Sequence, residues 1–338
     1  GEPYTYNKEA LGVPLKLTSA LSISYDKRKT VGEVYDQIVR DLDEAEKYFL
    51  MLPKEKQFLP NYRITLPAVQ LLKARVNLYM NNLEEAAKYA KNVIKDWDFA
   101  LYDLRSLSYD GVTFPNYVTY DNPETIWAFG KRNDLLKFTY DLTGDYGVKD
   151  HRVLINASDE LVDNYEDEGD LRKQFYLVPE YGYTPVCYLA VNKCMFLGES
   201  IPSDDKFMLA LRLSEAYLIL AEATAKTDPM IALNAVNELR KKRISEEKYK
   251  DKSGLSGDEL LEFVRNERRR ELCFEGHRWF DLRRYGMPSF TRVWKEGGVP
   301  AKWFTMEKED AAYTLPISKE VMDRNPGLIQ NRLGNPKY

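Results

Sequence analysis

The feature that most constrains the fold is a pair of helical segments, residues 66–81 and 83–94, which read LPAVQLLKARVNLYMN and LEEAAKYAKNVI. Large apolar residues and alanines recur at three- and four-residue spacing, which places them on one face of each helix. Ala74 is small enough to let two helices approach closely, and Tyr79 can fill the groove between them. These patterns predict a hairpin of the tetratricopeptide type, which buries its apolar face only by stacking on neighbouring helices.

Two other stretches extend this helical scaffold. Thr30 and Glu33 have the spacing of a capping box at the start of an amphipathic segment that Pro53 ends. A second hairpin is predicted at 209–226 and 229–243, where alanines again allow helices to approach closely.

The predicted fold class is therefore mostly α, a tetratricopeptide-like helical hairpin scaffold with a long irregular aromatic-rich loop region and a few short strands. We expect a single domain over residues 1–338. Its parts are a helical scaffold at 30–96 and 209–286, an irregular region at 97–205, and a C-terminal segment at 287–338 that wraps the surface. Within the irregular region, a short strand is expected at Thr125–Phe129, and Asp170 is expected to cap a helix that starts near Leu171.

A charged stretch, residues 265–286, reads RNERRRELCFEGHRWFDLRRYG. Glu267, Glu271 and Glu275 are spaced four apart, so on one helix they would form an acidic ridge that repels itself by a few tenths of a kcal/mol per pair. Guanidinium groups bind carboxylates bidentately and can neutralise such a ridge. The neighbouring candidates are Arg268, Arg269, Arg270 and Arg278. We interpret the stretch as an internal helical strut that buries ion pairs.

A catalytic interpretation of the same stretch is also possible, because Glu271 and Glu275 resemble the paired carboxylates of a glycosidase. That chemistry requires two carboxyl groups with different pKa values beside an open cleft. Nearby arginines would lower both pKa values together, which favours the structural interpretation. His277 has no second histidine or cysteine beside it, so we expect a hydrogen-bonded structural imidazole.

The string ERRREL-x-FEG-x-RWFDLRR in this stretch resembles the C-terminal signature of the SusD/RagB family. These are cell-surface nutrient-binding lipoproteins of Bacteroidetes that partner a TonB-dependent outer-membrane transporter. Three further stretches resemble the family in its order: PETIWAFG at 123–130, LRLSEAYLILAEA at 211–223 and LPISKEVMDRNPGLIQN at 315–331. The resemblance therefore runs through essentially the whole chain.

The resemblance implies a surface-exposed protein of the outer membrane that is lipid-anchored at full length. A family member would carry a signal peptide with a lipidated cysteine and then an N-terminal helical segment. The opening GEPYTYNKEALGVPL instead resembles the stretch that follows the first helical hairpin of the family. We therefore expect the anchor and the N-terminal segment to lie outside this sequence.

Charge and cysteine content exclude several classes of protein. A net charge of −4 lacks the basic excess of a nucleic-acid binder, and no apolar run approaches the roughly 20 residues that span a bilayer. The three cysteines lack metal-ligand spacing, so we expect no metal ion, and we expect no cofactor. A bridge between Cys187 and Cys194 remains open, although we expect these two residues and Cys273 to be buried free thiols.

The irregular region is the candidate ligand-binding region, because Gly, Pro, Asn and Asp interrupt a succession of aromatic residues there. Residues 131–150, KRNDLLKFTYDLTGDYGVKD, combine aromatic rings with polar side chains. That combination suits a sugar, whose C–H faces pack on rings and whose hydroxyls need donors and acceptors. The alternative is that the rings only anchor the loop to the scaffold. The candidate ligand-binding residues are Tyr117, Arg132, Asn133, Phe138, Tyr140 and Tyr146.

The predicted function is non-catalytic capture of oligosaccharides at the cell surface for import through a partner TonB-dependent (SusC-like) transporter. Family members also serve peptide uptake, so a peptide cargo remains open. A tetratricopeptide adaptor would bind a peptide in its concave groove instead. A glycoside hydrolase would need two carboxylates on one aromatic cleft, for which Asp141 and Asp145 are the loop pair to test.

Overall fold

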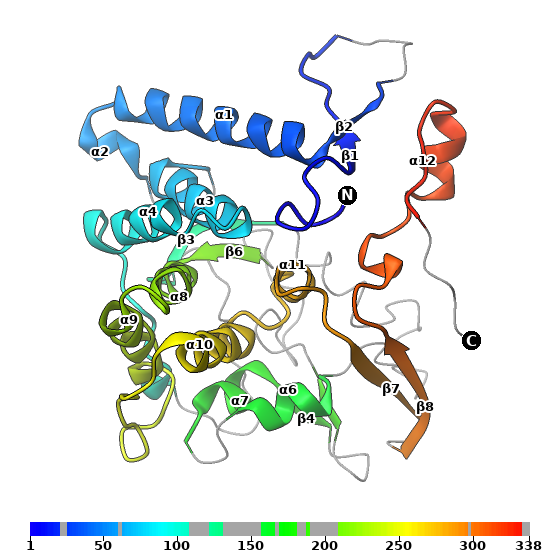
Figure 1. Cartoon of the computed structure of the whole chain (residues 1–338). Coiled ribbons are helices and arrows are strands. Elements are labelled where there is room, and N and C mark those ends of the chain that lie inside the picture. Colours follow the sequence, from blue (N-terminus) through cyan, green and yellow to red (C-terminus); the bar gives the residue numbers. More distant parts are fainter. Residues whose placement is uncertain are drawn as a thin grey trace, which may run out of the picture.

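The computed structural model describes residues 1–20, 26–59, 63–107, 122–130, 157–165, 169–180, 187–189, 209–296 and 299–332. The fold is mostly α, with short two-stranded sheets between and beside the helices (Figure 1). The helices are α1 (Val31–Leu50), α2 (Lys54–Gln57), α3 (Leu66–Tyr79), α4 (Leu83–Asp96), η1 (Leu104–Ser106), α6 (Asp159–Asn164), α7 (Leu171–Tyr176), α8 (Leu213–Thr224), α9 (Pro229–Lys241), α10 (Gly257–Glu271), α11 (Arg278–Arg284), η2 (Ala311–Tyr313) and α12 (Lys319–Arg324). The strands are β1 (Leu11–Pro14), β2 (Arg28–Thr30), β3 (Thr125–Phe129), β4 (Val178–Glu180), β5 (Cys187–Leu189), β6 (Leu209–Arg212), β7 (Phe290–Glu296) and β8 (Val299–Met306).

Two stacked helical hairpins, α3–α4 and α8–α9, form the main core, and the tetratricopeptide-like fold predicted from their spacing is confirmed. Helix α8 packs against α3, α4, α9 and α10, and every residue of α8 except Tyr217 is buried. Ala74, Ala90, Ala216 and Ala232 are fully buried where these helices meet. A methyl side chain at such positions lets helix axes approach closely, which explains the alanine-rich pattern.

Helix α1 begins as the capping box predicts. The Thr30 hydroxyl accepts a hydrogen bond from the Glu33 backbone N–H at 3.1 Å, and the Glu33 carboxylate accepts one from the Thr30 N–H at 2.8 Å. The helix ends at Leu50, before Pro53, and packs on α3. Two otherwise unsatisfied backbone donors are thereby paired at its first turn.

The second hairpin starts later than predicted, because residues 209–212 are a strand. Strand β6 pairs antiparallel with β3, with Ala128 opposite Ala210 and Phe129 opposite Leu209. Cross-strand hydrogen bonds hold this apolar segment extended, so helix α8 begins only at Leu213. The strand expected at Thr125–Phe129 is confirmed, and so is the Asp170 cap, whose carboxylate accepts from the Arg172 backbone N–H.

The expected single helix through residues 265–286 is wrong. Helix α10 ends at Glu271, and α11 begins at Arg278. Between them, Phe274 and Gly276 have φ values of 61° and 82°, in the left-handed region that stops a helix. Glu275 therefore lies in the connecting turn and not on the same helix as Glu271.

The C-terminal part of the chain includes an antiparallel hairpin, β7–β8, which lies at one side of the molecule (Figure 1). Trp294, Trp303 and Phe304 on this hairpin are exposed. Its base packs through Phe290 and Met306 against a small cluster around Tyr313. Within the described residues, no helix is both long enough and apolar enough to cross a membrane.

Candidate functional site

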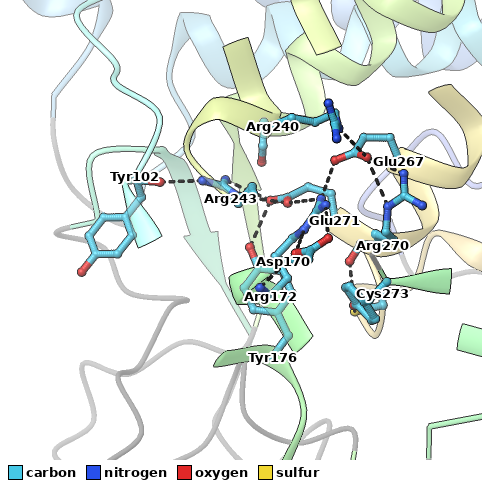
Figure 2. Close-up of polar contacts among 12 residues, drawn as sticks. Tyr102, Asp170, Arg172, Tyr176, Arg240, Arg243, Glu267, Arg270, Glu271 and Cys273 are labelled. Atoms are coloured by element: carbon cyan, nitrogen blue, oxygen red, sulfur yellow. Dashed lines mark hydrogen bonds and ion pairs between the residues drawn. The ribbon is translucent and has the colours of Figure 1, made fainter. Parts of the chain in front are cut away.

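The stretch that contains the three glutamates contributes to a buried ion network (Figure 2). Glu271 is fully buried and receives hydrogen bonds from Arg172 at 3.3 Å, from Arg212 at 2.5 Å, and from both Nε and Nη2 of Arg243 at 3.0 Å. The Tyr176 hydroxyl donates to the same carboxylate at 3.2 Å. Burial raises the pKa of Glu271, but the arginines outweigh it and hold that pKa well below its ordinary value.

Glu267 and Glu275 also form ion pairs with arginines. Glu267 is contacted by Arg172 at 2.6 Å and by Arg270 at 2.6 Å, which lowers its pKa to about 2 against the opposing effect of burial. Glu275 accepts a bidentate pair from Arg212, with N–O distances of 2.9 and 2.7 Å. Glu267 therefore stays ionised at neutral pH.

The sequence predicted only some of the arginines that pair with Glu267, Glu271 and Glu275. Among the four expected arginines, only Arg270 pairs with one of these three glutamates in the described structure. Arg268 pairs with Asp281 at 3.0 Å, and Arg269 pairs with Glu160 at 2.7 Å. Adjacent residues on a helix point about 100° apart, so side chains beside the glutamates in sequence face other neighbours. Within the described residues, Arg278 forms no ion pair with Glu267, Glu271 or Glu275.

Sequence reasoning missed the three arginines at the centre of this network, Arg172, Arg212 and Arg243. All three are buried; Arg172 lies at the start of α7, Arg212 at the end of β6, and Arg243 two residues after the end of α9. A signal existed for Arg212, because it interrupts the apolar string LALRLSEAYLILA just where the chain becomes buried. A charged residue in such a string requires a buried partner.

The network joins the scaffold to segments that lie within residues 97–205. Arg243 donates to the Tyr102 carbonyl oxygen and to Glu124, which directly precedes β3. Arg172 bonds Asp170 through both Nε and Nη2, at 2.9 and 2.7 Å. Ion pairs that are fully desolvated and completely hydrogen-bonded fix side chains in one arrangement. The network therefore fixes these described segments of residues 97–205 against the helical scaffold.

These groups are not suited to acid–base catalysis. A general acid near neutral pH needs a raised pKa, whereas the Glu271 pKa is lowered well below its ordinary value. His277 is buried, and burial together with Arg75 and Arg268 lowers its pKa well below the usual value, so the imidazole is neutral. Its Nδ1 lies 3.2 Å from the Arg268 guanidinium, which agrees with the expected structural role.

A cleft of about 610 Å³ lies beside this network, between η1, α7 and the turn after α9. Leu104 and Phe175 form its buried floor, while Arg105, Gln174 and Glu246 contribute polar groups. The remaining lining residues are Leu107, Leu171, Ser245 and Glu247. Small-molecule sites commonly have volumes of about 300–1,000 Å³ with an apolar lining and a few polar groups. The cleft is therefore a candidate binding site.

The position of Arg105 in this cleft is fixed by two carboxylate contacts. Its Nε and Nη2 donate to the two oxygens of Asp103 at 2.8 and 2.5 Å. Lys242 donates to the same carboxylate at 3.0 Å. Hydrogen bonds from Arg105 and Lys242 outweigh burial and hold the pKa of Asp103 well below its ordinary value. The guanidinium is thus oriented in advance for a polar ligand.

The predicted ligand-binding residues are not among those that the structure describes. Tyr117, Arg132, Asn133, Phe138, Tyr140 and Tyr146 all lie outside the described residues, as do Asp141 and Asp145. Leu107, which lines the cleft, is the last described residue before the segment that contains Tyr117.

The structure tests the expectation of buried free thiols for one of the three cysteines. Cys273 is a buried free thiol, as expected, with its sulfur 3.2 Å from the Tyr165 hydroxyl. Cys194 and the side chain of Cys187 lie outside the described residues, so the possible bridge between them stays open. In the described part of the chain, no group of three or more His, Cys, Asp or Glu side chains could hold a metal ion.

Comparison with known proteins agrees with this architecture. Residues 203–338 match the SusD family. SusD-like protein P38 of Formosa agariphila is 26% identical over 320 residues, which covers 80% of this chain and 61% of that protein. The C-terminal part of the chain therefore matches the SusD family, and the chain as a whole is similar to SusD-like proteins.

Solved structures show the same fold over almost the whole chain. A protein of Bacteroides vulgatus that is provisionally named as sugar binding superposes with a TM-score of 0.74 at 26% identity, covering 98% of this chain and 72% of that one. A SusD superfamily protein of Bacteroides thetaiotaomicron has a TM-score of 0.74 at 22% identity, with coverage of 98% and 73%. The chain spans less than two thirds of the length of the curated Formosa relative.

Proposed function

We propose that the chain captures oligosaccharides without breaking a bond, for import through a TonB-dependent outer-membrane transporter. The match of residues 203–338 to the SusD family and the similarity to a Bacteroides vulgatus protein provisionally named as sugar binding support this proposal. The transporter partner and a lipid-anchored position at the outer-membrane surface are part of the proposal, on the strength of the family resemblance.

The observation that carries the proposal is the cleft between η1 and α7. Its volume of about 610 Å³ can hold more than one sugar ring, and its floor is apolar while its polar groups come from Arg105, Gln174 and Glu246. A sugar presents the same combination of apolar C–H faces and hydroxyl edges. The cleft therefore offers the chemistry that an oligosaccharide requires.

The aromatic segments would complete this site. The chain continues from Leu107 directly into the segment with Tyr117, and residues 131–150 follow β3, which the ion network supports through Glu124. We propose that Phe138, Tyr140 and Tyr146 provide stacking rings, and that Arg132 and Asn133 donate hydrogen bonds to sugar hydroxyls.

The test is calorimetric titration of the chain with plant, host and microbial oligosaccharides, followed by chromatography of the same samples. We expect binding without new products. Tyr140→Ala or Tyr146→Ala should weaken binding by about 1–3 kcal/mol where the ring is a central anchor. Tyr48→Ala is the control, because Tyr48 is an exposed tyrosine on α1 and should leave binding unchanged.

Three outcomes would contradict parts of the proposal. Shortened products would indicate a hydrolase. Unchanged affinity in both tyrosine variants would exclude residues 131–150 as the stacking surface. Binding of peptides in place of oligosaccharides would assign the other cargo class to the chain.

A further inference from the structure

Three arginines and one glutamate lie together where helix α6 meets α10, α11 and strand β7 (Figure 1). Glu160 on α6 accepts from Arg269 on α10 at 2.7 Å, and its other oxygen accepts from Nη1 of Arg292 on β7 at 3.3 Å. Arg278, the first residue of α11, is close enough to act electrostatically on Glu160. These four residues are called the arginine cluster below.

Arg278 is half-buried and pairs with no carboxylate among the residues that the structure describes. Its Nε is buried and has no hydrogen-bond partner there. Asp281, one helical turn later on α11, is already paired with Arg268 at 3.0 Å and with Arg284 at 2.9 Å. A buried polar atom without a partner is rare in native proteins and requires an explanation.

Arg292 has hydrogen-bond donors that the described part of the chain does not use. Both of its hydrogen bonds come from Nη1, one to Glu160 and one to the Thr291 carbonyl oxygen at 3.1 Å. Nε and Nη2, which form the other edge of the guanidinium, donate to none of the described residues. The Arg292 Cζ lies 4.6 Å from the ring centroid of Phe290, and this contact helps to hold the guanidinium in place. Two donors on one edge can bind two oxygens of an anion.

The charges of the arginine cluster do not balance. The hydrogen bond from Arg269 lowers the pKa of Glu160, and the charges of Arg292 and Arg278 add to this effect, so Glu160 is ionised at neutral pH. Burial lowers the pKa of Arg278, and the charge of Arg269 lowers it further. Three guanidinium groups against one carboxylate leave an excess of two positive charges. A positive charge that is partly desolvated and unpaired is costly, which favours binding of an anion.

We propose that the arginine cluster binds a phosphate group, with Arg278 and Arg292 as its main contacts. A phosphate monoester carries a charge of about −1.5 to −2 at pH 7, which matches the excess positive charge of the cluster. Guanidinium groups bind phosphate oxygens bidentately, whereas a single carboxylate would neutralise only half of the excess. Glu160 holds Arg269 and Arg292 in place without neutralising the cluster. The proposal goes beyond oligosaccharide capture and does not depend on it.

The experiment is calorimetric titration of the whole chain with inorganic phosphate at pH 7 and low salt, with sodium acetate as the comparison. Arg278→Gln and Arg292→Gln should each weaken phosphate binding by about tenfold or more, because each removes charge-assisted hydrogen bonds to the anion. Arg324→Gln is the matched control, because Arg324 is an exposed arginine that pairs with Glu320 on α12. Urea unfolding checks folding, and Arg278→Gln should not lower the midpoint, since Arg278 has no ion pair to lose among the described residues.

Phosphate binding that weakens in both cluster variants and is unchanged in Arg324→Gln supports the proposal. Absence of phosphate binding overturns it, as does an equal affinity in the original chain and Arg278→Gln. Tighter binding of acetate than of phosphate overturns the assignment to phosphate. Tyr140→Ala and Tyr146→Ala should leave phosphate binding unchanged, so failure of oligosaccharide capture and failure of this site are distinguishable.

A second measurement distinguishes a phosphate in solution from the phosphate of a lipid headgroup. The chain is sedimented with phosphatidylcholine vesicles that contain or lack phosphatidic acid, whose headgroup is a phosphate monoester. Retention that requires phosphatidic acid and is lost in Arg278→Gln supports the site with a lipid as the source. Binding of inorganic phosphate without retention on either vesicle supports the site with a soluble phosphate as the source.

Discussion

Replacing Glu222 with glutamine should destabilise the protein strongly at neutral pH and only slightly in acid. Glu222 lies on α8 and is buried, and its two oxygens accept from Arg284 on α11 at 2.7 and 2.6 Å. Arg265 on α10 donates to the same carboxylate at 3.1 Å. Burial alone would raise the pKa of Glu222, but the arginines lower it from 4.5 to about 2.

The magnitude follows from that change in pKa. One pKa unit corresponds to about 1.4 kcal/mol, so a pKa of about 2 in the folded state contributes about 3 kcal/mol to stability. Because the folded-state pKa is depressed, this contribution is complete well above pH 4.5 and is lost as the pH falls towards 2. At pH 3 about 1 kcal/mol should remain. The value at neutral pH agrees with the roughly 3–5 kcal/mol lost when one partner of a buried pair is removed.

The assay is urea unfolding of the original chain and Glu222→Gln at pH 7, 5 and 3, followed by circular dichroism. The difference in unfolding free energy should be about 3 kcal/mol at pH 7 and about 1 kcal/mol at pH 3. Glu320→Gln is the control, because Glu320 pairs with Arg324 on the surface and should matter by no more than about 1 kcal/mol. A Glu222→Gln difference that is the same at all three pH values would refute the reasoning.

Two further predictions concern local backbone features. Thr30→Ala removes the hydroxyl that accepts from the Glu33 backbone N–H, so urea unfolding should show a loss of about 1 kcal/mol; an unchanged midpoint would show that the cap is dispensable. Gly276→Ala should cost about 1–2 kcal/mol by the same assay, because φ is +82° although no atom lies within 4 Å of the added Cβ. Gly327→Ala, where the Cβ position is also open and no positive φ occurs, should cost less, and equal losses in the two variants would contradict the backbone explanation.

The helical hairpins could be predicted because their information is local. Apolar spacing and small residues identify the helices of the α3–α4 pair, and Thr30 with Glu33 identifies the start of α1. The beginning of α8 was misplaced, since Leu209–Arg212 pairs with β3, which lies far away in sequence. An apolar segment of four residues can belong to a strand or to a helix, and only its partner decides between them.

The sequence indicated what kind of binding site to expect, but it did not identify the residues that line the cleft. Aromatic residues between the helical hairpins indicated a ligand-binding region, and the predicted rings at 131–150 stay a prediction. The cleft residues Arg105, Gln174 and Glu246 were not identified, because each is an ordinary polar residue in its own sequence context. The segments that carry them become neighbours only in the folded chain.

The sequence by itself determined the helix spacing, the caps, the presence of buried ion pairs near Glu271 and the resemblance to the SusD family. Only the tertiary structure decided which charges meet. Arg172, Arg212 and Arg243 lie 99, 59 and 28 residues before Glu271, yet all three bond to its carboxylate. A helix pattern depends on side chains within one or two turns, whereas the partner of a buried charge depends on how separate segments pack.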